Sequence, residues 1–443
     1  MSQSAALNHL VGIVGKENAI EEPRLLESSS VDGVKPAIVL FPENIEQISE
    51  IMKAASRDCL AVIPRGSGTK SGLGNRPGRA DIVVSTKRLN GVIKHESADL
   101  VVTAECGITL ADFQAQLALE NQFLPVDPPH ARDGATIGGI IASNDSGPMR
   151  LRYGTSRELL IGMKVVRADG SVFKGGSKVV KNVAGYDMPK LFVGSLGTLG
   201  IIAEATFRLY PVPELSRTYL AGFESLDRAH NTVKSLIDSN LVITALEHLT
   251  PGLADDISGR AGVVMSKRGY TLAVRIMNVA RAVEDQIKTV ADIFSGNGGQ
   301  GAVLEGGKED AFWDEVREFP WRPAASPGAV LKAGVLISDV PRLFLTLEDL
   351  SRAGGVAAHA SARAANGVVI ISISGDKDHV VDAVKKLREF SESAGGSLAV
   401  LEASPEVKAH VDAWGSIGSS LGLMKRIKSG FDPLNILNPG RLF

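Results

Sequence analysis

Glycine constrains this chain more than any other residue type, because the glycines gather in a few short segments. The sequence holds 47 glycines among 443 residues, whereas ordinary usage would give roughly 31. Residues 64–72, 136–144 and 194–202 each combine glycines with small polar side chains. Glycine accepts positive φ angles and lets the backbone approach a neighbour closely. We therefore expect these three segments to form the walls of one ligand site.

The segment from Pro64 to Gly72 follows a short apolar strand predicted over residues 60–63. Glycines at alternate positions can point consecutive amides in one direction and form a nest for an anion such as a pyrophosphate. Each charge-assisted hydrogen bond in such a nest can contribute roughly 1.5–3 kcal/mol. Thr69 stands where a P-loop needs glycine, and the spacing after Gly68 does not match the dinucleotide fingerprint. A glycine-rich turn without a ligand is the alternative for this loop alone.

Charge and cysteine content exclude several classes of protein. The chain has 48 basic and 50 acidic side chains, which argues against binding nucleic acid or an anionic membrane through bulk charge. Cys59 and Cys106, the two cysteines, cannot form a disulfide framework or a four-thiolate cluster. No segment is typical of a secretory signal or of a membrane span. We expect a cytoplasmic protein without direct membrane insertion, and peripheral association with the inner membrane through partners stays open.

The order of predicted elements indicates an α+β protein. The first group begins with a helix over 44–57 and strands over 60–63, 81–85 and 100–105. A helix over 109–122 and a mostly coil segment over 125–154 follow. The group ends with a hairpin over 163–172, which turns at residues 169–170, and a strand over 199–209. A second group holds a hairpin over 263–277, helices over 280–294, 341–353 and 379–394, and strands over 330–337, 368–374 and 398–401. That order is typical of helices on one face of a mainly antiparallel sheet. We place domains over 1–213 and 214–410, and a C-terminal segment over 411–443 that folds back on the first domain.

Several motifs together resemble the PCMH-type FAD-binding flavoproteins, also called the vanillyl-alcohol oxidase type. They lie at residues 64–74, 125–154, 176–187 and 194–200. Within that family, residues 127–130, 146–148 and 181–187 are most similar to the E subunits of bacterial glycolate oxidase, and residues 313–317 and the tail over 432–441 are also similar. The resemblance is strong over residues 31–213 and at the C-terminus, and weak between.

The resemblance implies an FAD-binding domain of two subdomains and an α+β cap domain on the substrate side. It also implies noncovalent FAD, because Thr69 occupies the position where some relatives carry a histidine bonded to the flavin. Lys181 and Tyr186 would support the flavin edge, unless Tyr186 is a buried aromatic residue with a satisfied hydroxyl. The residues implied to contact FAD are Pro64, Arg65, Gly66, Ser67, Gly68, Thr69, Gly72, Pro128, Thr136, Gly138, Gly139, Ala142, Asn144, Tyr186, Gly197, Gly200 and Ile202.

Catalytic residues are harder to assign. Oxidising a 2-hydroxy acid requires a cation for the carboxylate and a base for the hydroxyl proton. The candidates for the cation are Arg152, Arg317 and Arg322, and a solvated arginine or a structural ion pair is the alternative for each. His130 is a candidate for the base, and the alternatives are that it lines the cofactor or belongs to a plain loop.

Active relatives carry the motif His-x-Gly-Asp-Gly-Asn and neighbouring histidines that bind a divalent metal. The nearest match here, residues 372–379, lacks the first histidine, and the eight histidines of the chain are scattered. No pair of imidazoles stands at ligand spacing. We therefore predict no metal site in this chain.

Two functions remain open at this point. The first is an FAD-binding subunit of a glycolate or D-lactate dehydrogenase complex, acting in electron transfer or assembly. Its partners would be a second, catalytic FAD subunit of the D type and an iron–sulfur subunit. The second is a self-sufficient FAD-dependent 2-hydroxy-acid dehydrogenase with a metal-free site. A scaffold without flavin is the third alternative.

Overall fold

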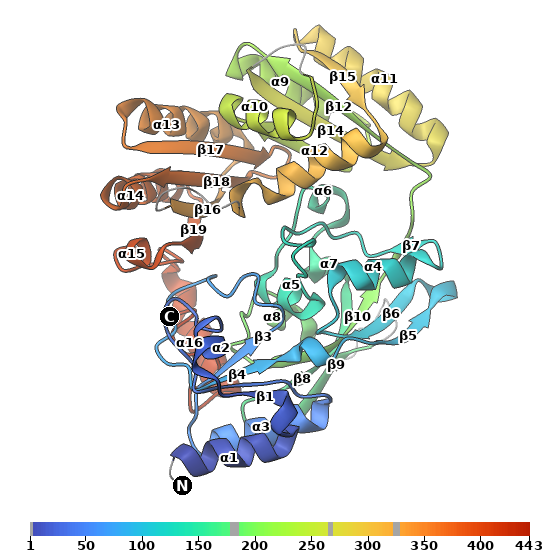
Figure 1. Ribbon diagram of the computed structural model, residues 1–443. Helices are drawn as coiled ribbons and strands as arrows, with labels where there is room; N and C mark the ends of the chain where they lie inside the picture. Colours follow the sequence, from blue (N-terminus) through green and yellow to red (C-terminus); the bar gives the residue numbers. More distant parts are fainter. Residues whose placement is uncertain (1–2, 178–185, 265–268, 322–327) are drawn as a thin grey trace. The chain divides into compact units, whose positions relative to one another are not determined.

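The computed structural model describes residues 3–177, 186–264, 269–321 and 328–443, and the chain divides into two compact units (Figure 1). The first unit comprises Met1–Ser146, Gly154–Val212 and Ile417–Phe443, and the second comprises Gly147–Tyr153 and Pro213–Ser416. Both units combine helices with β-sheets, and most strand pairs are antiparallel. The predicted α+β class is therefore confirmed.

A four-stranded sheet of order β1-β2-β4-β3 forms one part of the first unit. The strands β2 (Ile38–Leu40), β4 (Ile82–Ser85) and β3 (Val62–Arg65) run parallel, and β1 (Ala19–Ile20) is antiparallel to β2. The parallel strands are apolar runs because both of their faces are buried. Helices α1 (Gln3–Val14) and α3 (Ile45–Arg57) pack on one face, and α2 (Pro23–Glu27) packs on the other.

A five-stranded antiparallel sheet forms the other part of the first unit. Its order is β5 (Val92–Glu96), β6 (Val101–Glu105), β10 (Ile201–Arg208), β8 (Leu160–Val166) and β9 (Val172–Gly176). The β8–β9 hairpin turns at Asp169 and Gly170 as predicted, since Gly170 has a φ of +79°. Smaller elements of this unit are α4 (Leu110–Ala118), β7 (Gln122–Phe123), α5 (Ile137–Ser143), α7 (Ser156–Leu159), α8 (Pro189–Phe192) and β11 (Tyr210–Pro211).

One local prediction in this unit is wrong, and one helix was not predicted. The helix predicted over 109–122 ends at Ala118, and residues 122–123 form β7 instead. The segment over 125–154 is mostly coil as predicted, although it contains α5, which was not predicted and begins after its N-cap Thr136. The helix was missed because it is short and carries a glycine doublet, and glycine disfavours helices in general.

The second unit is built on one eight-stranded antiparallel sheet. Its strand order is β15 (Gln300–Leu304), β12 (Leu215–Phe223), β14 (Tyr270–Asn278), β13 (Ala245–Leu249), β17 (Val356–Arg363), β18 (Val368–Gly375), β16 (Gly328–Gly334) and β19 (Ser397–Ala403). Its helices are α6 (Arg150–Tyr153), α9 (Leu226–Ile237), α10 (Pro251–Arg260), α11 (Ala280–Gly296), α12 (Gly306–Glu318), α13 (Val340–Ala353), α14 (Lys377–Ser393) and α15 (Pro405–Lys408).

Helices cover both faces of this sheet, which corrects the prediction of helices on one face. Helices α9, α11, α13 and α14 pack on one face, whereas α10 and α12 pack on the opposite face of β12, β13 and β14. All five residues of β13 are buried for this reason. The hairpin predicted over 263–277 is also incomplete, because Val263 and Val264 lie outside any strand and residues 265–268 lie outside the described residues.

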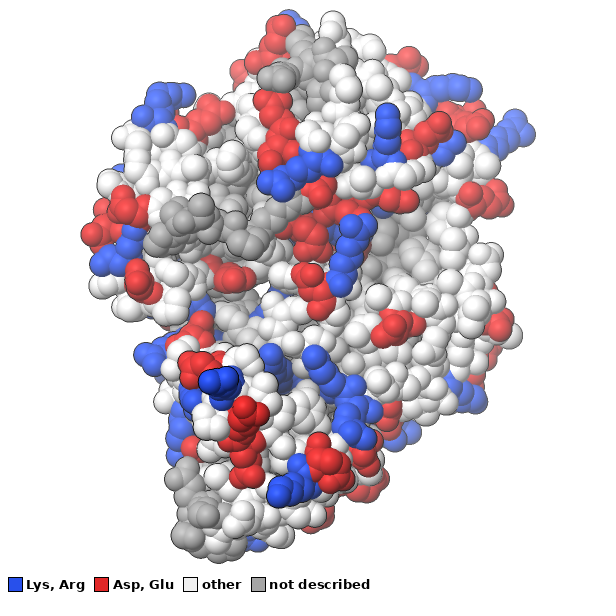
Figure 2. Space-filling view, in the orientation of Figure 1, with Lys and Arg blue, Asp and Glu red and all other residues white. Residues whose placement is uncertain are grey.

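The chain returns to the first unit at Ile417 and continues into α16 (Leu421–Phe431) and the C-terminal tail. Basic and acidic side chains are interspersed over the surface shown in Figure 2, in line with their near balance in the sequence. Among the described residues, no helix is long and apolar enough to cross a membrane.

Candidate functional site

The three glycine segments meet at one cleft in the first unit. Its empty volume is about 980 Å³, a figure that includes space open to solvent. The C-terminal tail adds Asn438 and Arg441 to the lining. The residues named in advance that line the cleft are Pro64, Arg65, Gly66, Ser67, Gly68, Thr69, Thr136, Gly138, Gly139, Ala142, Gly197, Gly200 and Ile202.

Four of the named residues are not part of this lining: Gly72, Pro128, Asn144 and Tyr186. The Tyr186 side chain is 93% exposed, so the alternative of a buried aromatic residue is wrong. Lys181 lies outside the described residues. Asn144 has a left-handed φ of +49° and ends α5. Its buried Oδ1 atom has no hydrogen-bond partner among the described residues.

The loop after β3 requires glycine at positions 66 and 68. A Cβ atom at Gly66 would lie 2.0 Å from the Thr136 hydroxyl. Gly68 has a φ of +85°, and a Cβ there would lie 2.3 Å from Nε of Arg65. The backbone of the loop therefore lies directly against Thr136, with the Arg65 side chain folded over it.

Helix α5 begins directly after Thr136, the residue against which this loop lies. The Thr136 hydroxyl accepts a hydrogen bond from the Gly139 amide at 3.3 Å, which caps the helix. The Gly138 amide donates to the Cys106 carbonyl at 2.8 Å, and a Cβ on Gly138 would lie 2.9 Å from that oxygen. Gly138, the first glycine of the doublet, thus lets α5 pack closely on the backbone of Cys106. Burial raises the pKa of the Cys106 thiol, so this cysteine is not a nucleophile.

The cleft carries positive charge that is only partly compensated. Lys70 forms an ion pair with Asp145, and both side chains are largely buried. Arg65 has no carboxylate within ion-pair distance among the described residues, and burial lowers the pKa of its guanidinium. Arginine stays charged in proteins, so Arg65 is a cation suited to a phosphate. The glycine cradle and this cation together fit an extended diphosphate ligand.

The cleft is also lined by residues that were not predicted to line it, among them Lys70, Asp145, Asn438 and Arg441. The sequence contained a signal for Asn438 and Arg441. Pro433, Pro439 and Gly440 interrupt regular structure in a tail that was expected to return to the first domain. No comparable signal marked Asp145, since its role depends on an ion pair between segments far apart in sequence.

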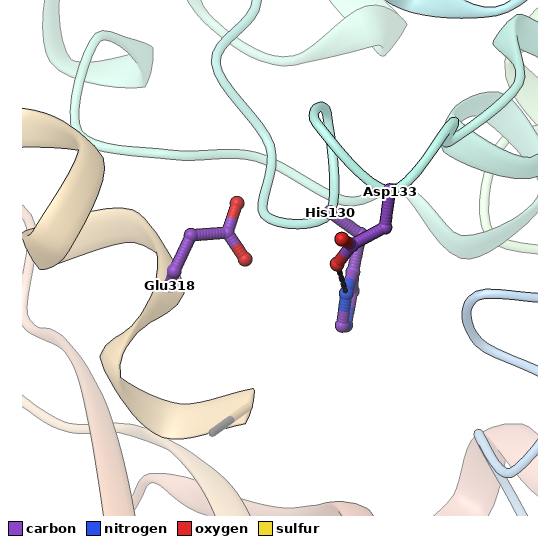
Figure 3. A group of neighbouring side chains, drawn as sticks. All are labelled: His130, Asp133 and Glu318. Atoms are coloured by element: carbon purple, nitrogen blue, oxygen red, sulfur yellow. Dashed lines mark hydrogen bonds and ion pairs between the residues drawn. The ribbon is translucent and has the colours of Figure 1, made fainter. Parts of the chain in front are cut away.

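His130 organises a loop. Its φ is +61°, and its backbone carbonyl accepts hydrogen bonds from the amides of Asp133 and Ala135. Nδ1 of the ring donates to the Asp133 carboxylate at 3.0 Å, as Figure 3 shows. The same figure draws Glu318, the last residue of α12 in the second unit. The loop alternative for His130 therefore has a concrete basis, and its role as a base stays a prediction.

The arginine candidates have protein partners. Arg152, in α6, donates to the Met277 carbonyl at 3.2 Å and lies over the Tyr153 ring. Arg317, in α12, forms an ion pair with Asp314. Arg322 lies outside the described residues.

The segment that resembles a metal motif begins a helix instead. Asp376 is the N-cap of α14 and accepts a hydrogen bond from the His379 amide at 3.2 Å. Its second carboxylate oxygen bonds the His379 ring, and this hydrogen bond lowers the pKa of Asp376. Both side chains are exposed. Capping therefore accounts for these two residues.

Comparisons with known proteins cover nearly the whole chain. The family described as FAD binding domain matches residues 36–176, and FAD linked oxidases, C-terminal domain, matches residues 212–406 and 416–442. The chain is 30% identical to glycolate oxidase subunit GlcD of Bacillus subtilis (strain 168), over 92% of this chain and 89% of that protein. It is 27% identical to a probable mitochondrial D-lactate dehydrogenase of Danio rerio, over 92% of this chain and 84% of that protein.

The fold is also that of a solved structure. The chain superimposes on p-cresol methylhydroxylase with a TM-score of 0.78 at 18% identity, covering 99% of this chain and 96% of the other. The glycolate oxidase subunit among these relatives is a D subunit, whereas the sequence motifs resembled E subunits. The choice between the two subunits therefore stays a prediction.

Proposed function

Because the chain belongs to the FAD-linked oxidases with a PCMH-type fold, we propose that it is the FAD-binding subunit of a complex that oxidises a short 2-hydroxy acid. FAD is its cofactor. Bound FAD supplies the acceptor for the two electrons and the hydrogen removed from C2 of the substrate.

The observation that carries this proposal is the cleft of the first unit. The amides of residues 66–69 and the Arg65 guanidinium would hold the pyrophosphate of FAD, and α5 would lie beside the cofactor. Thr69 offers no imidazole for a covalent bond, so the flavin is held by contacts alone. Acid precipitation tests this point: we expect the yellow colour to stay in solution, and colour in the protein pellet would contradict it.

The substrate class rests on the relatives. One is named as a glycolate oxidase subunit and another as a D-lactate dehydrogenase, and both names refer to short 2-hydroxy acids. The word subunit in the first name supports a complex. The proposed partners are a second FAD subunit and an iron–sulfur subunit, since two cysteines cannot hold a cluster here. Any association with the inner membrane would occur through them.

A self-sufficient dehydrogenase is the second candidate. It is favoured by the D-lactate dehydrogenase relative, which matches 92% of this chain without being named a subunit. Catalytic residues would then come from this chain alone.

Anaerobic mixing of the purified flavin-loaded chain with glycolate or D-lactate separates the two candidates. A subunit that depends on a catalytic partner should keep its oxidised flavin absorbance, whereas bleaching would exclude a purely auxiliary role. Copurification with a second flavoprotein and an iron–sulfur protein would count against the solitary enzyme. A colourless chain that does not bind added FAD would contradict both.

A further inference from the structure

The C-terminal tail is bonded to the strand and the loop that open the cofactor cleft. The Val62 amide, in β3, donates to the Ile436 carbonyl at 2.7 Å, and the Asn438 amide donates back to the Val62 carbonyl at 2.8 Å. Further along, the Gly78 amide donates to the Pro439 carbonyl at 2.9 Å. The tail therefore runs beside β3 and then beside the segment that follows the glycine loop.

Arg441 fixes the end of the glycine loop. Its guanidinium donates to the Asn75 carbonyl at 2.6 Å, to the Ser71 carbonyl, and to the Asp32 carboxylate at 3.0 Å. The residue is only 3% exposed. Burial lowers the pKa of Arg441, and Asp32 opposes that effect. A planar guanidinium can bind several acceptors at once, so one side chain holds two backbone carbonyls of the loop and a distant carboxylate.

Asn438 fixes a second wall of the cleft. Its side-chain amide donates to the Leu196 carbonyl at 2.7 Å. Leu196 lines the cleft and has a left-handed φ of +52°, which is unfavourable for a leucine and needs support from its surroundings. Asn438 also has a positive φ, +46°, a conformation that asparagine tolerates better than most residues.

A buried ion pair anchors the start of the tail. The Lys428 ammonium, in α16, pairs with Asp432 and also donates to the carbonyls of Thr198 and Leu437. The Asp432 carboxylate accepts hydrogen bonds from the amides of Ile436 and Leu437. The tail thus leaves α16 in a fixed direction and is joined to the segment containing Thr198 as well.

We propose that residues 432–441 are a strap that holds two walls of the cofactor cleft in their binding shape, with Arg441 as the positioning residue for the anion nest. This inference rests on the cleft being the FAD site proposed above. Arg441 acts through the backbone of the loop, since its charge is already paired with Asp32. The loop is rich in glycine, so ordering it on binding would be unfavourable, and a loop that is already ordered binds more tightly.

The test compares FAD binding by deflavinated full-length variants with the thermal stability of the same proteins without FAD. The key variants are Arg441→Gln and Asp32→Asn, and Arg426→Gln is the matched control because Arg426 is an exposed arginine of α16. We expect Arg441→Gln and Asp32→Asn each to raise the Kd for FAD by roughly 10-fold, the effect of losing about one charge-assisted hydrogen bond. The Kd for ADP, which carries the diphosphate and the adenosine of FAD but no flavin, should rise by a similar factor.

Asp32→Asn separates a positioning residue from a direct phosphate ligand. If the Arg441 guanidinium bound phosphate itself, Asp32→Asn would free its charge, and FAD binding would be unchanged or stronger. That result would overturn the proposal, as would an Arg441→Gln variant that binds FAD and ADP as tightly as Arg426→Gln does. Arg441→Lys covers the case in which Arg441→Gln does not fold. Lysine keeps the charge but cannot bridge the same acceptors, so it should also bind FAD more weakly than the control. Failure of the unaltered chain to bind FAD would instead count against the proposed function.

Discussion

At Gly66 the fold leaves no space for even one methyl group, because the Thr136 hydroxyl lies 2.0 Å from the position of a Cβ atom. Real Cβ atoms do not approach another atom that closely, so either the loop or α5 must move. Gly66→Ala should therefore reduce FAD affinity by at least roughly 10-fold, by displacing the amides that we propose hold the phosphate. Flavin fluorescence titration of the deflavinated protein measures this Kd.

A double variant identifies the cause of the loss. Thr136→Ala removes the hydroxyl, after which the nearest Thr136 atom would be its Cβ at 3.1 Å. Gly66→Ala/Thr136→Ala should bind FAD better than Gly66→Ala, although losing the cap destabilises α5 by about 1 kcal/mol. Gly78→Ala is the control, because its nearest neighbour would be 3.9 Å away. Equal FAD affinity for Gly66→Ala and Gly78→Ala would show that the contact is not limiting.

His248 gives the second unit a pH dependence. Its ring is buried against Phe344 and Tyr270, and burial, followed by the nearby His230, lowers the pKa of His248 from 6.5 to about 3. In the unfolded chain His248 therefore binds a proton as the pH falls below about 6.5, whereas in the folded chain it stays neutral until the pH approaches 3. Stability is full above pH 6.5 and falls as the pH drops toward 3, by up to a few kcal/mol.

The three tryptophans of the chain, Trp313, Trp321 and Trp414, all belong to the second unit, so their fluorescence reports its unfolding. Urea titrations between pH 7 and pH 4 should show a smaller loss of stability for His248→Phe than for the unaltered chain. His410→Leu, at an exposed position, should behave like the unaltered chain. Parallel pH profiles for all three proteins would refute this role of His248.

At the scale of elements, α12 is joined to the sheet of the second unit by a buried carboxylate. Glu309 is 2% exposed and accepts hydrogen bonds from the Ser216 and Thr218 hydroxyls at 2.6 and 2.9 Å. Nε of Arg275 lies 3.1 Å from the same oxygen. Glu309→Leu should destabilise the second unit by about 3–5 kcal/mol, because it leaves the Arg275 charge buried without this partner.

Two further variants give this prediction its controls, again by urea titration with tryptophan fluorescence. Asp310 also faces Arg275, at 3.7 Å, but it is 72% exposed. Asp310→Asn should therefore change stability by less than about 1 kcal/mol. Glu309→Leu/Arg275→Leu removes both charges and should recover much of the loss. A Glu309→Leu variant no less stable than Asp310→Asn would contradict the argument.

Elements with a strong local signal were predicted well. Residues 44–57 carry a helical apolar stripe behind an asparagine cap, and α3 follows that pattern. Asp169 and Gly170 marked a hairpin that the structure contains. Helix α5 was missed because it is short and carries a glycine doublet, and because it packs on Cys106, which is remote from it in sequence. The cleft-lining role of Arg441 was missed for the same reason, since its partners Asp32, Ser71 and Asn75 are remote in sequence.

At the scale of the whole molecule, the chain crosses between its units more than once. It leaves the first unit after Val212, builds the second unit, and returns at Ile417 to supply α16 and the strap. Every described residue that lines the cleft belongs to the first unit. A ligand that binds only the folded form stabilises the part that forms its site. The binding free energy of FAD should therefore appear first in the stability of the first unit.

Heating the loaded protein while following two signals tests this expectation. Release of flavin, seen as a rise in flavin fluorescence, reports the first unit, and tryptophan fluorescence reports the second. FAD at 100 times its Kd adds about 2.7 kcal/mol to the unit that binds it, so the flavin-release midpoint should rise more than the tryptophan midpoint. Arg441→Gln should lower the first midpoint and leave the second nearly unchanged. If both midpoints shifted equally in both experiments, the strap and the second unit would share a single cooperative transition. The two units would then unfold as one, which would contradict this expectation.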